Sequence, residues 1–94
     1  MPRYVIERDF GQVDDDEMLE IAVISKTAIF EGFPDITWEL SHVCSDDTGA
    51  IKTFCIYDAP NQDRLREHAE RMGRHVVRQI FEIAGDIDPR EIKM

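Results

Sequence analysis

The chain has 94 residues, which suits one domain with a small core and is too short for two. Asp and Glu total 20 against 11 Lys and Arg, a formal net charge of −9. This argues against nucleic acid or an anionic membrane as partner, because both require a basic face on the protein. Hydrophobic residues make up 43% of the chain, so a disordered polar segment is excluded as well. We expect a single domain over residues 1–94.

Cysteine use indicates the compartment. Cys44 and Cys55 fall in apparent strands and not in a CxxC pair, and no basic-then-apolar leader precedes the first strand. Free thiols of this kind are typical of a reducing cytoplasm, which is the expected location. No uninterrupted apolar run is longer than that at residues 21–24, which is far shorter than the roughly 20 residues needed to cross a bilayer.

The first two elements are a strand and a helix. Residues 3–10 alternate apolar and polar side chains, which predicts a strand. Acidic residues 14–17 then suit the first turn of a helix that runs to about Glu31, where Gly32 can supply a left-handed cap and Pro34 prevents continuation. The apolar stripe of this helix has helical spacing and consists of Met18, Ile21, Ala22, Ser25, Ala28 and Ile29.

A β-hairpin follows. Residues 36–45 and 50–58 read as strands joined by a turn at 46–49, whose last residue is Gly49. The second strand is apolar on both faces, with Phe54 and Ile56 on one and Cys55 and Tyr57 on the other. A strand of this kind is expected to be covered on both sides.

The remaining elements complete the order β-α-β-β-α-β. Asn61 is a plausible N-cap for a second helix that Gly73 ends, and after a connection at 74–78 a fourth strand spans residues 80–87, closed by Pro89. This order predicts a ferredoxin-like α+β sandwich, an antiparallel four-stranded sheet with two helices on one face. The helices leave the other face open, so we expect a homodimer of the dimeric α/β barrel type, formed through the open sheet faces.

Catalytic sequence motifs are absent, and the candidates for chemistry are single residues. His42 and Cys44 stand two apart on one strand face and could ligate one metal ion, but without a third ligand a partly buried edge His beside a small apolar Cys is the better explanation. His75 is expected to be solvated in a loop. His68 borders the apolar stripe of the second helix, either as a satisfied boundary residue or as a functional imidazole. Four aromatic residues are core or cavity lining: Trp38, Tyr4, Tyr57 and Phe54.

Several segments together resemble a known family. They are VIERDF at 5–10, ITW at 36–38 and, most specifically, KTFCIYDAP at 52–60 followed by REHA at 66–69. These segments are similar to the domain of unknown function 4242 family of small bacterial proteins, some of which are called nickel-binding proteins. The chain departs from that family in the turn after the second helix, residues 73–77, and in a longer hairpin turn at 46–50.

The resemblance implies a ferredoxin-like dimer and, for the nickel-binding members, a divalent nickel ion. The motif positions retained here are Cys55, Tyr57, Glu67 and His68, which the resemblance offers as metal ligands. Nickel or another divalent transition metal is thus the expected cofactor, and no organic cofactor is implied.

Three hypotheses for function remain open. The first is a non-enzymatic dimer that captures a divalent metal ion through His68 with nearby carboxylate or thiolate groups. The second is a cofactor-free enzyme or small-ligand binder that uses the cavity of a dimeric α/β barrel, with His68 handling a proton and Tyr57 or Trp38 lining the cavity. The third is an oligomerising module that recognises another protein.

Overall fold

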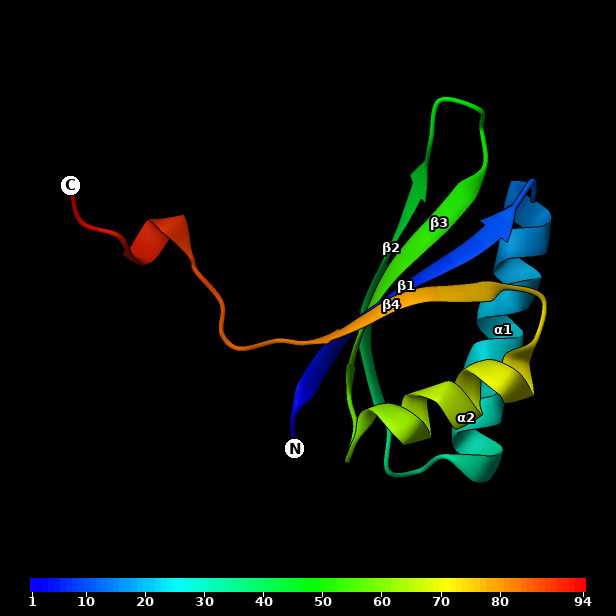
Figure 1. Ribbon diagram of the computed structural model, residues 1–94, viewed down its shortest axis with the longest axis horizontal. Helices are drawn as coiled ribbons and strands as arrows, with labels where there is room; N and C mark the ends of the chain where they lie inside the picture. Colours follow the sequence, from blue (N-terminus) through cyan, green and yellow to red (C-terminus); the bar gives the residue numbers. More distant parts are fainter.

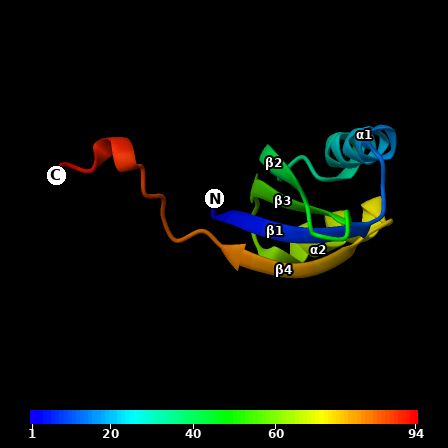
Figure 2. The ribbon, with the colours of Figure 1, turned by 90° about the horizontal axis from the view of Figure 1, so that it is seen from above.

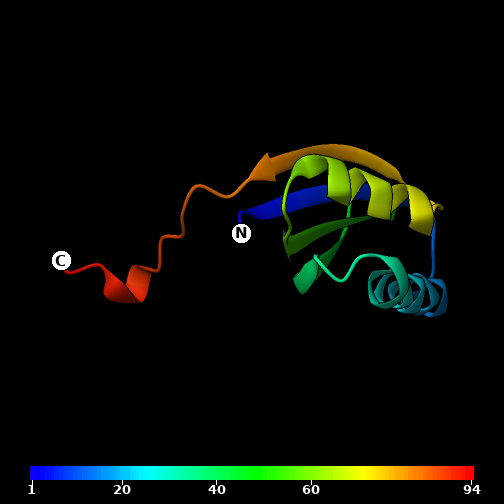
Figure 3. The same cartoon turned by 90° about the horizontal axis from the view of Figure 1, so that it is seen from below.

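The computed structural model describes all 94 residues. The elements in chain order are β1 (Arg3–Gly11), α1 (Asp15–Gly32), β2 (Thr37–Ser45), β3 (Ile51–Asp58), α2 (Gln62–Met72), β4 (Val76–Glu82) and a 3-10 turn (Pro89–Glu91). The four strands form one antiparallel sheet in the order β2-β3-β1-β4 (Figure 1). Both helices lie on one side of it (Figures 2 and 3). The predicted ferredoxin-like α+β fold is therefore confirmed.

Helix α1 begins at a complete capping box. The Asp14 carboxylate accepts a hydrogen bond from the Glu17 backbone N–H at 2.8 Å, and the Glu17 carboxylate accepts one from the Asp14 N–H at 3.2 Å. This exchange satisfies two backbone donors that the first turn would otherwise leave unpaired. The predicted left-handed cap at Gly32 is wrong. Gly32 is the last helical residue, and Phe33 closes the helix with φ −135° by donating its N–H to the Ile29 carbonyl.

The hairpin and α2 agree with the prediction. The Asp46 carboxylate organises the turn between β2 and β3 by accepting from the backbone N–H groups of Thr48 and Ala50. The Asn61 side chain caps α2 by accepting from the Arg64 N–H at 3.0 Å. Gly73 ends the helix with φ +65°, a conformation that residues with a Cβ rarely adopt.

The fourth strand begins and ends earlier than predicted. β4 spans Val76–Glu82 and pairs with β1 from Val76 opposite Asp9 to Glu82 opposite Tyr4. The prediction of 80–87 was wrong because β1 starts at Arg3, whose carbonyl accepts the last inter-strand bond from the Ile83 N–H. Beyond that point no residue of β1 remains to pair with, and the C-terminal segment extends away from the sheet (Figure 1).

The core lies between the sheet and the helices. Its central members come from β1, β3, α2 and the α1–β2 connection: Tyr4, Ile6, Cys55, Tyr57, Leu65, Phe33 and Ile36. The opposite face of the sheet, called here the open face, carries Leu40 and Phe81, which are 53% and 57% exposed. Neither helix combines the length and the apolar composition needed to span a bilayer.

Candidate functional site

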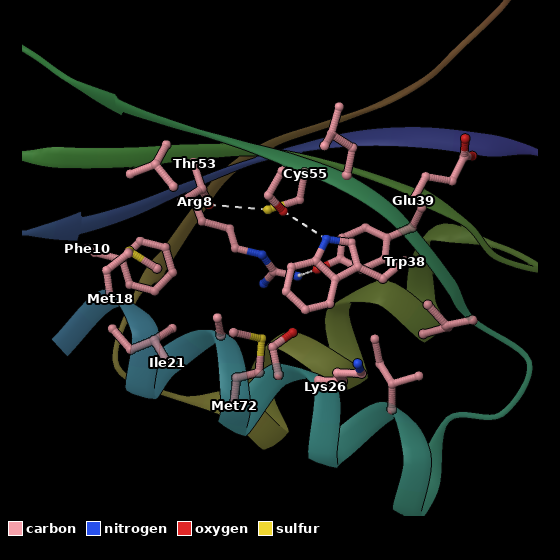
Figure 4. A pocket seen from close by; sticks show the side chains of 18 of the residues that line it. Arg8, Phe10, Met18, Ile21, Lys26, Trp38, Glu39, Thr53, Cys55 and Met72 are labelled. Carbon is pink, nitrogen blue, oxygen red and sulfur yellow. Dashed lines mark hydrogen bonds between the residues drawn. The ribbon is translucent and has the colours of Figure 1, made fainter. Parts of the chain in front are cut away.

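A cavity opens between α1 and the strands β2 and β3. Its volume is about 700 Å³ and most of its lining is apolar, including Phe10, Ile21, Trp38 and Met72 (Figure 4). Figure 3 shows α1 on the β2 side of the sheet and α2 on the β4 side, and the cavity lies along α1. Pockets that bind small organic molecules have volumes of about 300–1,000 Å³ and mostly apolar linings. The cavity has both properties.

Arg8 is the one charged side chain buried in this region. It is 1% exposed although it lines the cavity, and Figure 4 shows its side chain running from β1 toward the helices. Nη2 donates to the Tyr57 hydroxyl at 3.1 Å and Nη1 donates to Nε2 of His75 at 2.7 Å. The Nε atom has no hydrogen-bond partner. Both partners of this guanidinium are thus neutral side chains.

Side chains of β1 point alternately to the two faces of the sheet, and this alternation places Arg8 in the interior. Tyr4, Ile6, Arg8 and Phe10 all point to the helix face, where each is buried. Arg8 was not among the site residues predicted from the sequence, although it shares the parity of Tyr4, Ile6 and Phe10. A basic residue at a core-facing strand position is the signal that could have identified it.

His75 is a partner of Arg8 and not a solvated loop residue, so that expectation was wrong. Its Nδ1–H donates to the Gly73 carbonyl at 2.7 Å, which leaves Nε2 as the acceptor for Arg8. The ring stacks on Phe10 with 5.0 Å between the ring centroids. Burial lowers the pKa of His75, and the neighbouring Arg8 charge lowers it further. His75 is therefore held neutral.

His68 lies behind the cavity and does not line it. The side chain is fully buried, with Nε2 3.2 Å from the Ser25 carbonyl oxygen and 3.5 Å from the Ser25 hydroxyl. A neutral ring that donates from Nε2 to this carbonyl leaves Nδ1 as an acceptor, and Nδ1 has no partner. The rings of Phe33 and Tyr57 meet it edge-on. Burial is the main cause that lowers the pKa of His68 to about 4.

The four predicted metal ligands do not converge on one point. Tyr57 and His68 are in contact, with ring centroids 5.9 Å apart. The Cys55 thiol instead donates to the Thr53 hydroxyl at 3.3 Å, and the Glu67 carboxylate pairs with Arg64 at 2.7 Å. The chain contains no group of three His, Cys, Asp or Glu side chains placed to hold a metal ion.

The donors around His68 therefore do not fit a divalent cation within one chain. The His68 imidazole is neutral and uses Nε2 on a backbone carbonyl, while burial raises the pKa of the Tyr57 phenol and disfavours the phenolate form. The charge nearest to them is positive, because Arg8 bonds to Tyr57 and opposes protonation of His68. The assignment of Cys55 and the other three residues as ligands stays a prediction.

The arrangement is suited to holding a small molecule next to a fixed positive charge. The sequence predicted that the aromatic residues are either core or cavity lining. Trp38 and Tyr57 line the cavity, whereas Tyr4 belongs to the core. Phe54 lies on the other face of β3, half-buried. His68 does not reach the cavity, because Ser25 and Tyr57, which contact it, form the cavity wall.

Comparison with known proteins adds a family and a fold relative. A family model described as "Nickel responsive protein SCO4226-like" matches residues 4–83. The crystal structure of SCO4226 from Streptomyces coelicolor A3(2) superposes with a TM-score of 0.69 at 14% sequence identity, covering 90% of this chain and 99% of that one. No curated protein matches the sequence. The matched region, residues 4–83, contains both helices and all four strands apart from the first residue of β1.

Proposed function

This chain belongs to the SCO4226-like family of nickel responsive proteins, and from that premise we propose that it is a cytoplasmic homodimer that binds divalent nickel or a similar transition-metal ion. The family match over residues 4–83 carries the proposal. Both cysteines are free thiols, which suits a reducing compartment. The resemblance of the 52–69 segment to nickel-binding proteins points the same way.

The open face supplies exposed donors for such an ion. His42 and Cys44 are both exposed on the edge strand β2 and pair with Phe54 and Lys52 of β3. Alternate strand residues share a face, so these two donors lie opposite the face that the helices cover. Imidazole and thiolate both bind nickel, zinc and copper. Two donors are too few for a complete site, and a second copy would double them.

A second copy would also cover apolar surface. Leu40, Val76 and Phe81 are each more than half exposed, and Leu40 and Phe81 pair with Ile56 and Val5 across the open face. Exposed apolar patches on a small sheet are typical of association surfaces. A twofold axis through the open face would bury the same patch on both copies.

Metal titration of the stripped protein tests the proposal and locates the ligands. Calorimetry with Ni²⁺, Zn²⁺ and Cu²⁺ is expected to show saturable binding, with Cu²⁺ the tightest according to the Irving–Williams order. If the open face holds the ion, His42→Gln weakens nickel binding at least tenfold while His68→Gln leaves it unchanged. The reverse result would assign the ion to the predicted set around His68. Absence of saturable binding in the wild type would overturn the proposal.

A second candidate function, binding of a small organic molecule, is favoured by the cavity itself. Its volume of about 700 Å³ falls within the range of about 300–1,000 Å³ that is typical of small-molecule sites. A variant that narrows the cavity, Ala22→Phe on the cavity side of α1, tests this function, because it should weaken the uptake of small molecules without altering the open face.

A further inference from the structure

The charge of Arg8 has no counter-charge in the protein. Arg8 takes part in none of the ion pairs, although the chain carries 20 Asp and Glu residues. Buried charges in proteins are ordinarily paired with an opposite charge, because desolvation penalises an isolated ion. An unpaired guanidinium at 1% exposure is therefore an unusual feature that a bound anion would resolve.

The guanidinium also has free hydrogen-bond donors. Of its five N–H groups, one is used on Tyr57 and one on His75. The Nε–H is buried without a partner. The planar fork of an arginine matches the two oxygens of a carboxylate, which can accept from Nε–H and a neighbouring Nη–H together. The unused N–H groups of Arg8 thus have the planar arrangement that a carboxylate requires.

The walls around Arg8 define the rest of the ligand. Phe10, Ile21 and Met72 lie on one side of the guanidinium and Trp38 on the other (Figure 4). At the rim, Lys26 is exposed and belongs to no ion pair, whereas Glu39 is neutralised by Arg3 at 2.9 Å. The cavity therefore combines apolar walls with net positive charge inside a protein whose overall charge is −9.

We propose that this cavity binds a small organic acid, whose carboxylate pairs with Arg8 and whose apolar body packs against Phe10, Ile21 and Met72. The inference rests on the second candidate function and adds the chemical class of the ligand to it. Neutral His75 and Tyr57 hold the guanidinium in place through Nη1 and Nη2, and the side of Arg8 that carries Nε is left for the ligand.

The test compares two probes of equal shape and different charge. Octanoate and octanamide are titrated into the full-length protein by calorimetry or ligand-observed NMR at pH 7.5. We expect octanoate to bind at least tenfold more tightly than octanamide. Arg8→Gln should remove this preference while octanamide still binds. The matched control is Arg66→Gln, which makes the same charge change at an exposed arginine of α2 that forms no ion pair, and it should keep the preference.

The outcomes distinguish failure of small-molecule binding in the cavity from failure of the preference for an organic acid. If neither probe binds, or if Ala22→Phe binds both as well as the wild type does, small-molecule binding in the cavity itself fails. If both probes bind equally to the wild type, only the inference about the acid is overturned. Loss of the preference in Arg66→Gln would assign it to overall charge and overturn the inference too. Should Arg8→Gln fail to fold, Arg8→Lys replaces it, since a lysine keeps the charge without the fork and should reduce the preference.

Discussion

Arg8 and His75 are joined by a 2.7 Å hydrogen bond between Nη1 and Nε2, although 67 positions separate them in the sequence. The bond fixes the tautomer of His75, because a nitrogen that accepts from a guanidinium carries no proton. The Gly73 carbonyl completes the arrangement by accepting from Nδ1–H. The turn after α2 is thereby tied to the middle of β1.

Replacing His75 by phenylalanine should destabilise the protein. His75→Phe preserves the stacking on Phe10 but removes the acceptor of Arg8, leaving a further buried N–H unpaired. We expect a loss of about 1–3 kcal/mol in the free energy of unfolding, measured by urea denaturation. Leu19→Phe, at an exposed position of α1 away from the open face, is the control and should change stability by less than about 0.5 kcal/mol. Equal losses in the two variants would contradict this role.

Stability should fall as the solution becomes acidic, because His68 is buried and His75 half-buried in the neutral form. The folded-state pKa of His68 is about 4, below its ordinary value of 6.5, so the unfolded chain takes up protons first as the pH falls. The stabilisation is complete above about pH 6.5 and is lost progressively toward pH 4. His75 adds to this in the same direction, since its pKa is lowered as well.

Urea unfolding at two pH values checks the contribution of His68. Between pH 7.5 and pH 5 we expect the wild type to lose about 2 kcal/mol through this residue. In His68→Gln the amide can still donate to the Ser25 carbonyl but does not titrate, so the loss should be smaller by about that amount. His42→Gln should behave like the wild type. An unchanged pH dependence in His68→Gln would show that the residue does not control it.

The Tyr57 hydroxyl should matter more than that of Tyr4, although both side chains are buried. Tyr57→Phe removes an acceptor of the Arg8 guanidinium, and we expect it to cost about 1–3 kcal/mol in urea denaturation. No side chain or backbone group bonds to the Tyr4 hydroxyl, so Tyr4→Phe is the matched control and should be close to neutral. The interpretation fails if the two variants are equally stable.

A charge on the open face should separate the proposed dimer. Phe81 is 57% exposed on β4, and Phe81→Glu would place a carboxylate in the apolar patch of both copies. Sedimentation at micromolar concentration should give twice the chain mass for the wild type and the chain mass for the variant. Leu19→Glu, on the exposed side of α1, is expected to leave the dimer intact. A monomeric wild type would remove the dimer from the proposal.

Local chemistry allowed most elements to be predicted from the sequence. Asp14 and Asn61 mark helix starts, and Gly73 marks a helix end, because capping involves groups only a few residues apart. Strand alternation likewise indicated the two faces of β3. The end of β4 could not be predicted in this way, because it depends on where β1 begins, more than 70 residues earlier in the chain.

The candidate site likewise combines features that are local in the sequence with contacts that form only in the folded chain. The sequence by itself determined that Tyr57 and Trp38 stand on strands and that His68 borders the apolar side of a helix, since periodicity fixes the face of each side chain. Only the tertiary structure decided that His68 is sealed behind Ser25, 43 positions earlier in the chain. It alone also placed Arg8 in the lining of a cavity without an ion-pair partner. Pairing between distant segments and the position of α1 relative to the sheet determine these contacts, and neither leaves a local pattern in the chain.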